Sequence, residues 1–502
     1  MAALLHTGLE RAAERFGDRD AIRAGDSRWS FRDLDAASSA FARHLAAAGV
    51  ASHQRVAVMT SNRPEFVVAV HGISKAGAAA VLLSPAWKAV EVGHALELTG
   101  PVHAVADGAA VALLAGRLPV TDLDDEVARH AAPAGEPSPR AAPVAGGDES
   151  VLVFSSGTTG LPKAVRHTHD SMWHATRHWC EVLALGPDDR FQVATPPSHI
   201  LGLLNLLAAA EAGATVRLHL RFDLDEILGR IQSERMTLEM AVAPIALAMA
   251  NHPNIEDFDL SSLRYVMWGA TPVSESVAQV VTRRTGVRWL PAYGASEVPV
   301  IACNPVGSPD RWRLDSAGLP PAGVELRVAD LESGEILRPG QVGELQVRSQ
   351  SVMAGYLPGA ATAEAFAGGW YRTGDVGWLE PEGWVHLTDR SKEMIKVNGF
   401  QVAPAEVEAV LLGHRAVLDC AVFGIPDERA GEVPVAAVQL DPAQALGEGE
   451  LEQLVAGSLA TYKHLRHVVV VDAIPRLPSG KALRRTLRDE WAPRLAVGGR
   501  GD

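Results

Sequence analysis

A short loop rich in hydroxyl groups and glycine gives the clearest sign of chemistry in the chain. It reads SSGTTGLPK, residues 155–163, and the apolar run VLVF comes directly before it. Gly157 and Gly160 let backbone N–H groups turn to one side, the hydroxyls add donors, and Lys163 adds a positive charge. Such a loop after a buried strand is typical of polyphosphate binding. It is not a Walker A loop, because Leu-Pro separates the second glycine from the lysine.

Four further motifs follow this loop along the chain. They are YGASE (293–297), YRTGD (371–375), DRSKEMIKVNGFQVAPAEVE (389–408) and PSGKALRR (478–485). In this order the five motifs resemble the acyl-adenylate-forming superfamily, which includes acyl- and aryl-CoA synthetases, adenylation domains of peptide synthetases and beetle luciferases. The resemblance runs from about residue 10 to 490 and is strongest to the acyl- and aryl-CoA ligases, because the last two motifs match their form.

The resemblance implies an ATP-dependent carboxylate–CoA ligase, which is an acid–thiol ligase. A carboxylate is a poor electrophile, so it first attacks the α-phosphorus of ATP and forms an acyl-AMP. The thiol of coenzyme A then displaces AMP and leaves an acyl-CoA thioester. The expected cofactors are therefore ATP or AMP, Mg²⁺ and coenzyme A, and the expected substrate is a small carboxylic acid.

The resemblance also implies which residues bind the nucleotide. Glu297 is expected to contact Mg²⁺, since a hard cation prefers oxygen ligands. Tyr293 is expected to stack on adenine, and Asp375 and Arg390 to reach the ribose hydroxyls. The β- and γ-phosphates are assigned to Ser155, Ser156, Gly157, Thr158, Thr159, Gly160 and Lys163. Gly269, Ala270, Gly294 and Ser296 complete the expected nucleotide contacts.

Two lysines are expected to act in turn at one reacting carbonyl. Lys481, which follows the turn Pro-Ser-Gly, would stabilise negative charge at the α-phosphate and the substrate carboxylate. Lys396 matches a family segment, with Gly399 and Gln401, that enters the site for thioester formation. Because one site can hardly hold both lysines at once, the resemblance implies that the small domain rotates about Lys392.

The acid is expected to bind near two aromatic side chains. His199, in PPSHILG, matches a position that gates the acyl site, with a satisfied core histidine as the alternative. Trp268, in VMWGATP, occupies an expected pocket-wall strand where the family usually has a small residue. It either shortens the pocket or points away into the core. Gly269 and Gly294 complete the expected substrate pocket.

Three residues depart from the family pattern on the nucleotide or acyl side. Ala164 replaces a glycine next to the phosphate loop, Ser296 replaces threonine, and Trp268 is large. An alternative function is therefore weak adenylation, with the enzyme mainly converting acyl-AMP to acyl-CoA. Loading of a separate carrier protein is another alternative. A non-catalytic nucleotide-binding protein is disfavoured, because the charged site residues are retained.

The apolar patterns predict an α/β fold. Up to about residue 300, strand-like runs alternate with helical ones, which predicts βαβ units and a mostly parallel sheet. Short alternating strands after about residue 315 predict a small β-barrel-like subdomain. We expect a large N-terminal domain of layered α/β sheets over residues 1–389 and a small mobile α+β domain over residues 390–502.

Composition limits the partners. The chain has 502 residues and a formal net charge of −14, which argues against nucleic acid as a partner. Its three cysteines are far apart and have no zinc or disulfide spacing, which fits a reducing cytoplasm. Neither a signal peptide nor a membrane span is expected. The oligomeric state stays open, with a homodimer as one option.

Overall fold

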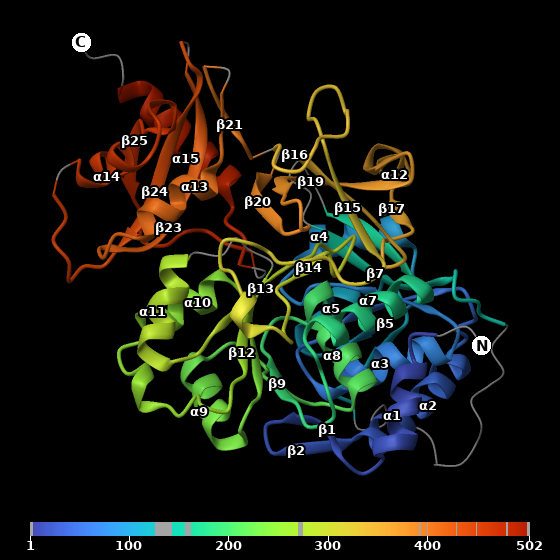
Figure 1. Cartoon of the computed structure of the whole chain (residues 1–502). Helices are drawn as coiled ribbons and strands as arrows, with labels where there is room; N and C mark the ends of the chain where they lie inside the picture. Colours follow the sequence, from blue (N-terminus) through green and yellow to red (C-terminus); the bar gives the residue numbers. More distant parts are fainter. Residues whose placement is uncertain are drawn as a thin grey trace.

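The structure is a computed structural model. It describes residues 4–125, 143–155, 162–269, 275–390, 393–398, 400–427, 429–447, 449–477 and 480–498. Within these ranges the strands form five sheets, and helices cover them to give a layered α/β molecule (Figure 1).

The largest sheet has seven strands and carries the predicted phosphate loop. Their order is β17 (Gly355–Leu357), β8 (Lys163–Thr168), β7 (Glu149–Ser155), β4 (Ala79–Leu82), β3 (Arg55–Met59), β5 (His103–Ala106) and β6 (Val120–Asp122). The strands from β7 to β6 run parallel, whereas β8 and β17 are antiparallel additions. In β3, Val56 and Val58 face one core while Ala57 and Met59 face another. Burial on both faces explains why these strands read as continuous apolar runs.

Two four-stranded sheets complete the layered body. One has the order β2 (Ser27–Ser30), β1 (Asp20–Ala24), β10 (Thr215–Leu218) and β9 (Arg190–Val193). The other has the order β11 (Leu238–Ala241), β12 (Tyr265–Trp268), β13 (Trp289–Tyr293) and β14 (Ala302–Cys303). The first sheet joins distant parts of the chain, because β1 pairs in parallel with β10.

Helices between and beside these strands follow the predicted alternation. They are α1 (Thr7–Phe16), α2 (Phe31–Ala47), α3 (Pro64–Lys75), α4 (Ala89–Thr99), α5 (Gly108–Leu114), α7 (His169–Val182), α8 (Ile200–Ala212), α9 (Leu224–Glu234), α10 (Ala243–Asn251) and α11 (Glu275–Thr285), with the 3₁₀ turns η1 (Ile255–Asp257) and η2 (Pro309–Arg311). No helix among the described residues is long and apolar enough to cross a membrane.

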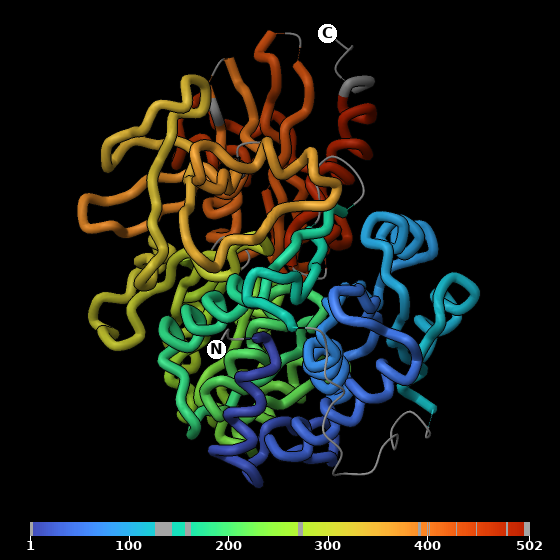
Figure 2. Tube along the Cα trace, turned by 90° about the vertical axis from the view of Figure 1, so that its right-hand side faces the viewer, coloured from blue at the N-terminus to red at the C-terminus, as the bar shows by residue number. Residues whose placement is uncertain are grey.

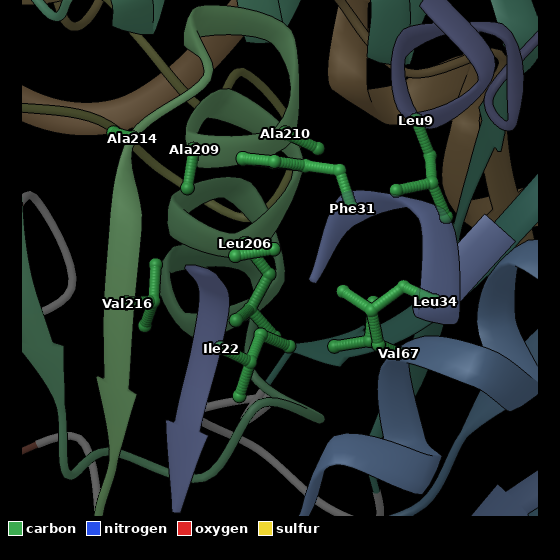
Figure 3. A pocket seen from close by; sticks show the side chains of 11 residues that line it. Leu9, Ile22, Phe31, Leu34, Val67, Leu206, Ala209, Ala210, Ala214 and Val216 are labelled. Carbon is green, nitrogen blue, oxygen red and sulfur yellow. The ribbon is translucent and has the colours of Figure 1, made fainter. Parts of the chain in front are cut away.

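The contact between α1, α2 and α8 leaves a small gap in the core (Figure 3). Leu9, Phe31, Leu34 and Leu206 are among the apolar side chains that line it. Its volume is about 10 Å³, at the lower limit for a single water molecule. An apolar gap of this size is a packing defect and offers no ligand site.

An antiparallel sheet follows the layered body, as predicted. It contains β15 (Val324–Ala329), β16 (Gly343–Ser349), β19 (Trp370–Leu379), β18 (Phe366–Ala367) and β20 (Val385–Arg390), with α12 (Ala360–Ala365) beside it. Register shifts interrupt the β16–β19 and β19–β20 ladders, which bends the sheet into a half-barrel.

The last sheet belongs to the C-terminal part of the chain. Its strands are β22 (Phe400–Val402), β21 (Ile395–Val397), β24 (Gly431–Leu440), β23 (Val417–Asp427) and β25 (His467–Val470). The helices are α13 (Pro404–Leu412), α14 (Glu450–Ser458) and α15 (Arg484–Gly498), with the turn η3 (Thr461–Lys463). These elements gather at one end of the molecule (Figures 1 and 2) and enclose hydrophobic clusters of their own. The predicted fold class is confirmed.

Candidate active site

The two strands that flank the phosphate loop form an antiparallel hairpin. Ser155, the last residue of β7, pairs with Lys163, the first residue of β8. The Lys163 ammonium lies 5.4 Å from the centre of the Tyr356 ring, within reach of a cation–π interaction. His94 hydrogen-bonds through Nε2 to the Pro162 carbonyl oxygen at 3.0 Å. The base of the loop is thus fixed by the sheet and by α4.

Glu297 lies in a buried group of phenols. Its Oε1 accepts a hydrogen bond of 2.7 Å from the Tyr356 hydroxyl, and that hydroxyl lies 3.5 Å from the hydroxyl of Tyr371. Burial, reinforced by the Glu297 carboxylate, raises the pKa of Tyr371 well above its usual value, so this phenol stays neutral. Sequence reasoning missed both tyrosines as site residues, although Tyr371 opens the YRTGD motif.

The backbone around Glu297 is held from two sides. His167 bonds through Nε2 to the Ser296 carbonyl oxygen at 2.8 Å, and the Met353 N–H donates to the Glu297 carbonyl oxygen at 2.8 Å. These contacts tie the YGASE motif to β8 and to the segment before β17. The Glu297 carboxylate is therefore fixed in direction before any ligand arrives.

Asp375 lies close to the same group. Its Oδ2 accepts a hydrogen bond of 2.6 Å from the Tyr293 hydroxyl, and its backbone N–H donates to Thr373 Oγ1 at 3.0 Å. The charge of Asp375, like that of Glu297, acts on the Tyr371 hydroxyl. The structure thus brings two predicted carboxylates and Tyr293 together. Across the β19–β20 ladder, the backbone of Asp375 pairs with that of Arg390.

Lys481 follows a tight turn that packs against the start of α10. The turn is closed by hydrogen bonds of 2.8 Å from the Leu477 N–H to the Lys481 carbonyl and from the Gly480 N–H to the Leu477 carbonyl. Gly480 has φ +83°, and a Cβ built on it would lie 2.8 Å from Pro244 Cδ. The turn therefore packs against the first residues of α10, directly after β11.

Lys396, the second predicted catalytic lysine, has a different environment. Its side chain is exposed in the β21–β22 hairpin, where Lys396 pairs with Gln401. Its backbone N–H donates to Glu432 Oε2, a residue of β24, at 2.9 Å. The turn of Lys481 thus packs against α10, while Lys396 faces solvent.

His199 caps the start of α8. Its Nδ1 lies 3.5 Å from the Leu201 N–H, a long capping contact, and desolvation lowers its pKa so that the imidazole is neutral. A gating role for His199 stays a prediction.

Trp268 packs in the core, which favours the second of the two alternatives left by the sequence. It is 1 % exposed, its ring centre lies 5.1 Å from that of Trp289, and it belongs to the hydrophobic cluster around α10 and α11. Its neighbour Met267 belongs to the other cluster, as strand alternation requires. A Cβ on Gly269 would lie 3.2 Å from the Met267 sulfur, so Met267 and Gly269 share that face. A role of Trp268 in the substrate pocket stays a prediction.

Ala164, which replaces a glycine of the family pattern, lies in a regular part of the sheet. Ala164 pairs with Phe154 on one side and with Leu357 on the other, and it is completely buried within the sheet. Its extended conformation suits any residue, so a methyl group here displaces no backbone N–H. By contrast, Gly294 needs to be glycine, because a Cβ would lie 2.2 Å from the Pro299 carbonyl oxygen.

Some predicted contacts cannot be placed. Those outside the described residues are Ser156, Gly157, Thr158, Thr159, Gly160, Ala270, Lys392 and Gly399. The structure describes only the backbone of Arg390 and Gln401.

Together, the loop hairpin, the buried carboxylates and the lysine turn are the arrangement of an adenylate-forming enzyme. The family model of the AMP-binding enzyme matches residues 9–357, and that of the AMP-binding enzyme C-terminal domain matches residues 406–481. The chain belongs to the AMP-binding enzyme family, within the acyl-adenylate-forming superfamily.

Curated relatives and solved structures are similar to this chain over nearly its whole length. A 4-coumarate–CoA ligase 5 from Oryza sativa subsp. japonica is 33% identical over 505 residues, which cover 96% of this chain and 94% of the relative. An anthranilate CoA ligase, AuaEII, in complex with anthranoyl-AMP has a TM-score of 0.91 at 26% identity and covers 99% of this chain and 98% of its own. The o-succinylbenzoate CoA synthetase MenE from Bacillus subtilis, with its acyl-adenylate intermediate, has a TM-score of 0.86 at 30% identity, covering 97% and 98%. The chain is an ATP-dependent acid–CoA ligase that works through an acyl-AMP.

Proposed function

We propose that Lys481 and Lys396 serve the two half-reactions in turn, through rotation of the C-terminal domain about Lys392. The contact of Gly480 with Pro244 carries this proposal, because it packs the Lys481 turn against the large domain while Lys396 is exposed. The conformation fits acyl-AMP formation. Thioester formation requires the small domain to turn, so that the hairpin of Lys396 takes the place of the Lys481 turn.

In the first half-reaction, different residues bind the ribose and the phosphates of ATP and stabilise the reacting group. Asp375 accepts hydrogen bonds from the ribose hydroxyls, and Tyr293, which donates to it, fixes its direction. Lys163 and the loop that ends at it neutralise the phosphates. Lys481 stabilises the negative charge that grows as the acid attacks the α-phosphorus.

Glu297 fits a role as the protein ligand of Mg²⁺. In the described residues no group of three or more His, Cys, Asp or Glu side chains could hold a metal ion. Mg²⁺ needs no such cage, because it is commonly bound by one carboxylate together with substrate phosphates and water. The Tyr356 hydroxyl holds one oxygen of Glu297, which aims the carboxylate. The metal would supply charge neutralisation at the phosphates.

The substrate is an aryl carboxylic acid in our proposal. The named relative is a 4-coumarate–CoA ligase, and the two solved neighbours bind anthranoyl and o-succinylbenzoyl adenylates. Because Trp268 packs in the core, we expect it not to narrow the pocket against a ring. We further propose a cytoplasmic location, since the three cysteines are unpaired thiols. A homodimer stays a prediction.

A panel of aryl and short aliphatic acids tests these proposals, with pyrophosphate release and thioester formation measured separately. We expect Lys481→Ala to abolish pyrophosphate release yet still convert supplied acyl-AMP to acyl-CoA, and Lys396→Ala to do the reverse. Unchanged pyrophosphate release in Lys481→Ala would contradict the role of that lysine.

The same panel separates the alternatives. Pyrophosphate release without thioester formation from free coenzyme A would favour loading of a carrier protein. Thioester formation only from supplied acyl-AMP would favour weak adenylation. Two observations weigh against that alternative: Ala164 pairs regularly within the sheet, and Trp268 packs in a hydrophobic cluster.

A further inference from the structure

Lys481 forms an ion pair with Glu393, a residue to which the sequence motifs assign no role. Its Nζ lies 3.4 Å from Glu393 Oε1. We propose that Glu393 is a positioning residue for Lys481, which orients the ammonium for acyl-AMP formation. This inference rests on the proposed role of Lys481.

Glu393 is itself firmly anchored. Its other carboxylate oxygen, Oε2, is paired with the Arg484 guanidinium. Arg484 also donates from Nη2 to both oxygens of Glu408, at 2.8 and 2.9 Å. The side chains of Glu393, Arg484 and Glu408 are each only 15% exposed, so solvent screens these pairs much less than pairs on the open surface. The carboxylate that faces Lys481 therefore has a fixed position.

The cluster connects the parts of the small domain that must move together. Arg484 is the first residue of α15 and Glu408 lies on α13, while Glu393 directly follows the segment that contains the proposed hinge. Because Glu393 and Lys481 both lie beyond Lys392, a rotation about that hinge carries the pair as one unit. Lys481 then reaches the large domain already oriented.

The chemistry of the ammonium suits this arrangement. A lysine ammonium has three N–H donors and no acceptor. An ammonium held by Glu393 can therefore also donate to the α-phosphate and to the substrate carboxylate. A long lysine side chain also has many rotamers, and the ion pair restricts them before ATP binds, which lowers the entropy lost on reaching the transition state.

Other residues position the backbone of the turn, so Glu393 is needed only to orient the Lys481 side chain. Arg476 donates from Nη1 to the Gly480 carbonyl oxygen at 2.8 Å and is paired with Asp419. Loss of Glu393 therefore leaves the backbone of the turn in place. Arg484 loses its pair with Glu393 but keeps its pair with Glu408, so the fold should persist while Lys481 loses its ion pair.

The test compares Glu393→Gln and Glu393→Asp with a matched control. Glu406→Gln is the control, because Glu406 pairs with Lys463 at 2.6 Å in the same domain and has no assigned role at the site. ATP–pyrophosphate exchange, with kcat and KM for ATP and acid, reports the first half-reaction. Conversion of supplied acyl-AMP to acyl-CoA reports the second, and thermal unfolding reports stability.

We expect Glu393→Gln to lower kcat of exchange about tenfold with little change in KM, since one weakened transition-state contact of this kind has that effect. Conversion of acyl-AMP should stay at the wild-type rate. Glu393→Asp should recover part of the exchange, and Glu406→Gln should match the wild type. Exchange within twofold of the wild type in Glu393→Gln, or an equal loss in both half-reactions, would overturn the inference.

Lys481→Ala in the same assays separates this inference from the proposed function. If that variant keeps its exchange activity, the assigned role of Lys481 is wrong, and the inference about Glu393 fails with it. If Lys481→Ala abolishes exchange but Glu393→Gln does not lower it, only the positioning role of Glu393 is refuted.

Discussion

Burial of Glu239 makes the stability of the protein fall as the pH rises from about 4.5 to about 8. This residue of β11 is buried, and its carboxyl group accepts hydrogen bonds from Gln192 Nε2 at 2.8 Å and from the Met240 N–H at 3.1 Å. Burial raises the pKa of Glu239 from 4.5 to about 8, and the two hydrogen bonds offset only part of that effect. The folded protein thus keeps a neutral acid here at pH 7.

The sign of the pH dependence follows from this raised pKa. Above about pH 4.5 an unfolded chain releases the proton of Glu239, whereas the folded protein holds it until about pH 8. Because the folded state binds more protons over this interval, stability falls as the pH rises and levels off above pH 8. Between pH 6 and pH 9 the loss amounts to roughly 2 to 3 kcal/mol, which corresponds to a fall in Tm of about 3 °C for a domain of this size.

The assay is thermal unfolding at pH 6 and pH 9. Glu239→Gln keeps the size and neutrality of the protonated acid, so we expect its Tm to fall less between the two pH values than that of the wild type. Glu344→Gln is the control, since Glu344 is also buried but is paired with Arg372 at 2.8 Å. If Glu239→Gln and the wild type lose the same Tm between pH 6 and pH 9, the account of Glu239 is wrong.

Three further predictions concern the site and the N-terminal core. Tyr356→Phe removes the hydrogen bond of 2.7 Å to Glu297. Pyrophosphate exchange should fall about tenfold, and a higher Mg²⁺ concentration should be needed for half-maximal activity. An unchanged Mg²⁺ titration would count against the role of Glu297. Gly480→Ala places a Cβ 2.8 Å from Pro244 at a positive φ, so it should lower exchange while conversion of supplied acyl-AMP persists; equal losses in both assays would instead indicate a folding defect. Burial lowers the pKa of His71 from 6.5 to about 3, so stability should fall as the pH drops below 6.5. His71→Gln should reduce this loss when Tm is compared at pH 7 and pH 5. If the variant and the wild type show the same difference in Tm, His71 is not the cause.

Much of the fold could be predicted from local patterns in the sequence. The alternation of strands and helices before residue 300, and the short strands after residue 315, both reflect periodicities that a few neighbouring residues reveal. Pairing between distant segments leaves no such local trace. Nothing in the spacing of β1 indicates that it joins β10, because that choice depends on the assembled layers.

The candidate site also has residues that short sequence motifs reveal and residues that they do not. Glu297, Asp375 and Tyr293 could be named because they belong to short motifs, and the structure places them together. The Tyr356 hydroxyl that holds Glu297 comes from a segment outside those motifs. The orientation of Trp268 could not be predicted either, since both faces of β12 are buried and alternation alone does not say which face borders the acid.

The pairing of β1 with β10 has a consequence for synthesis on the ribosome. Thr215 Oγ1 donates to the Asp20 carbonyl oxygen across 195 residues of chain. At about 5 to 20 residues per second, the first strand waits on the order of ten seconds or more for its neighbour to emerge. During that time the β1–β2 hairpin exposes an unpaired edge, which a chaperone could shield on the nascent polypeptide.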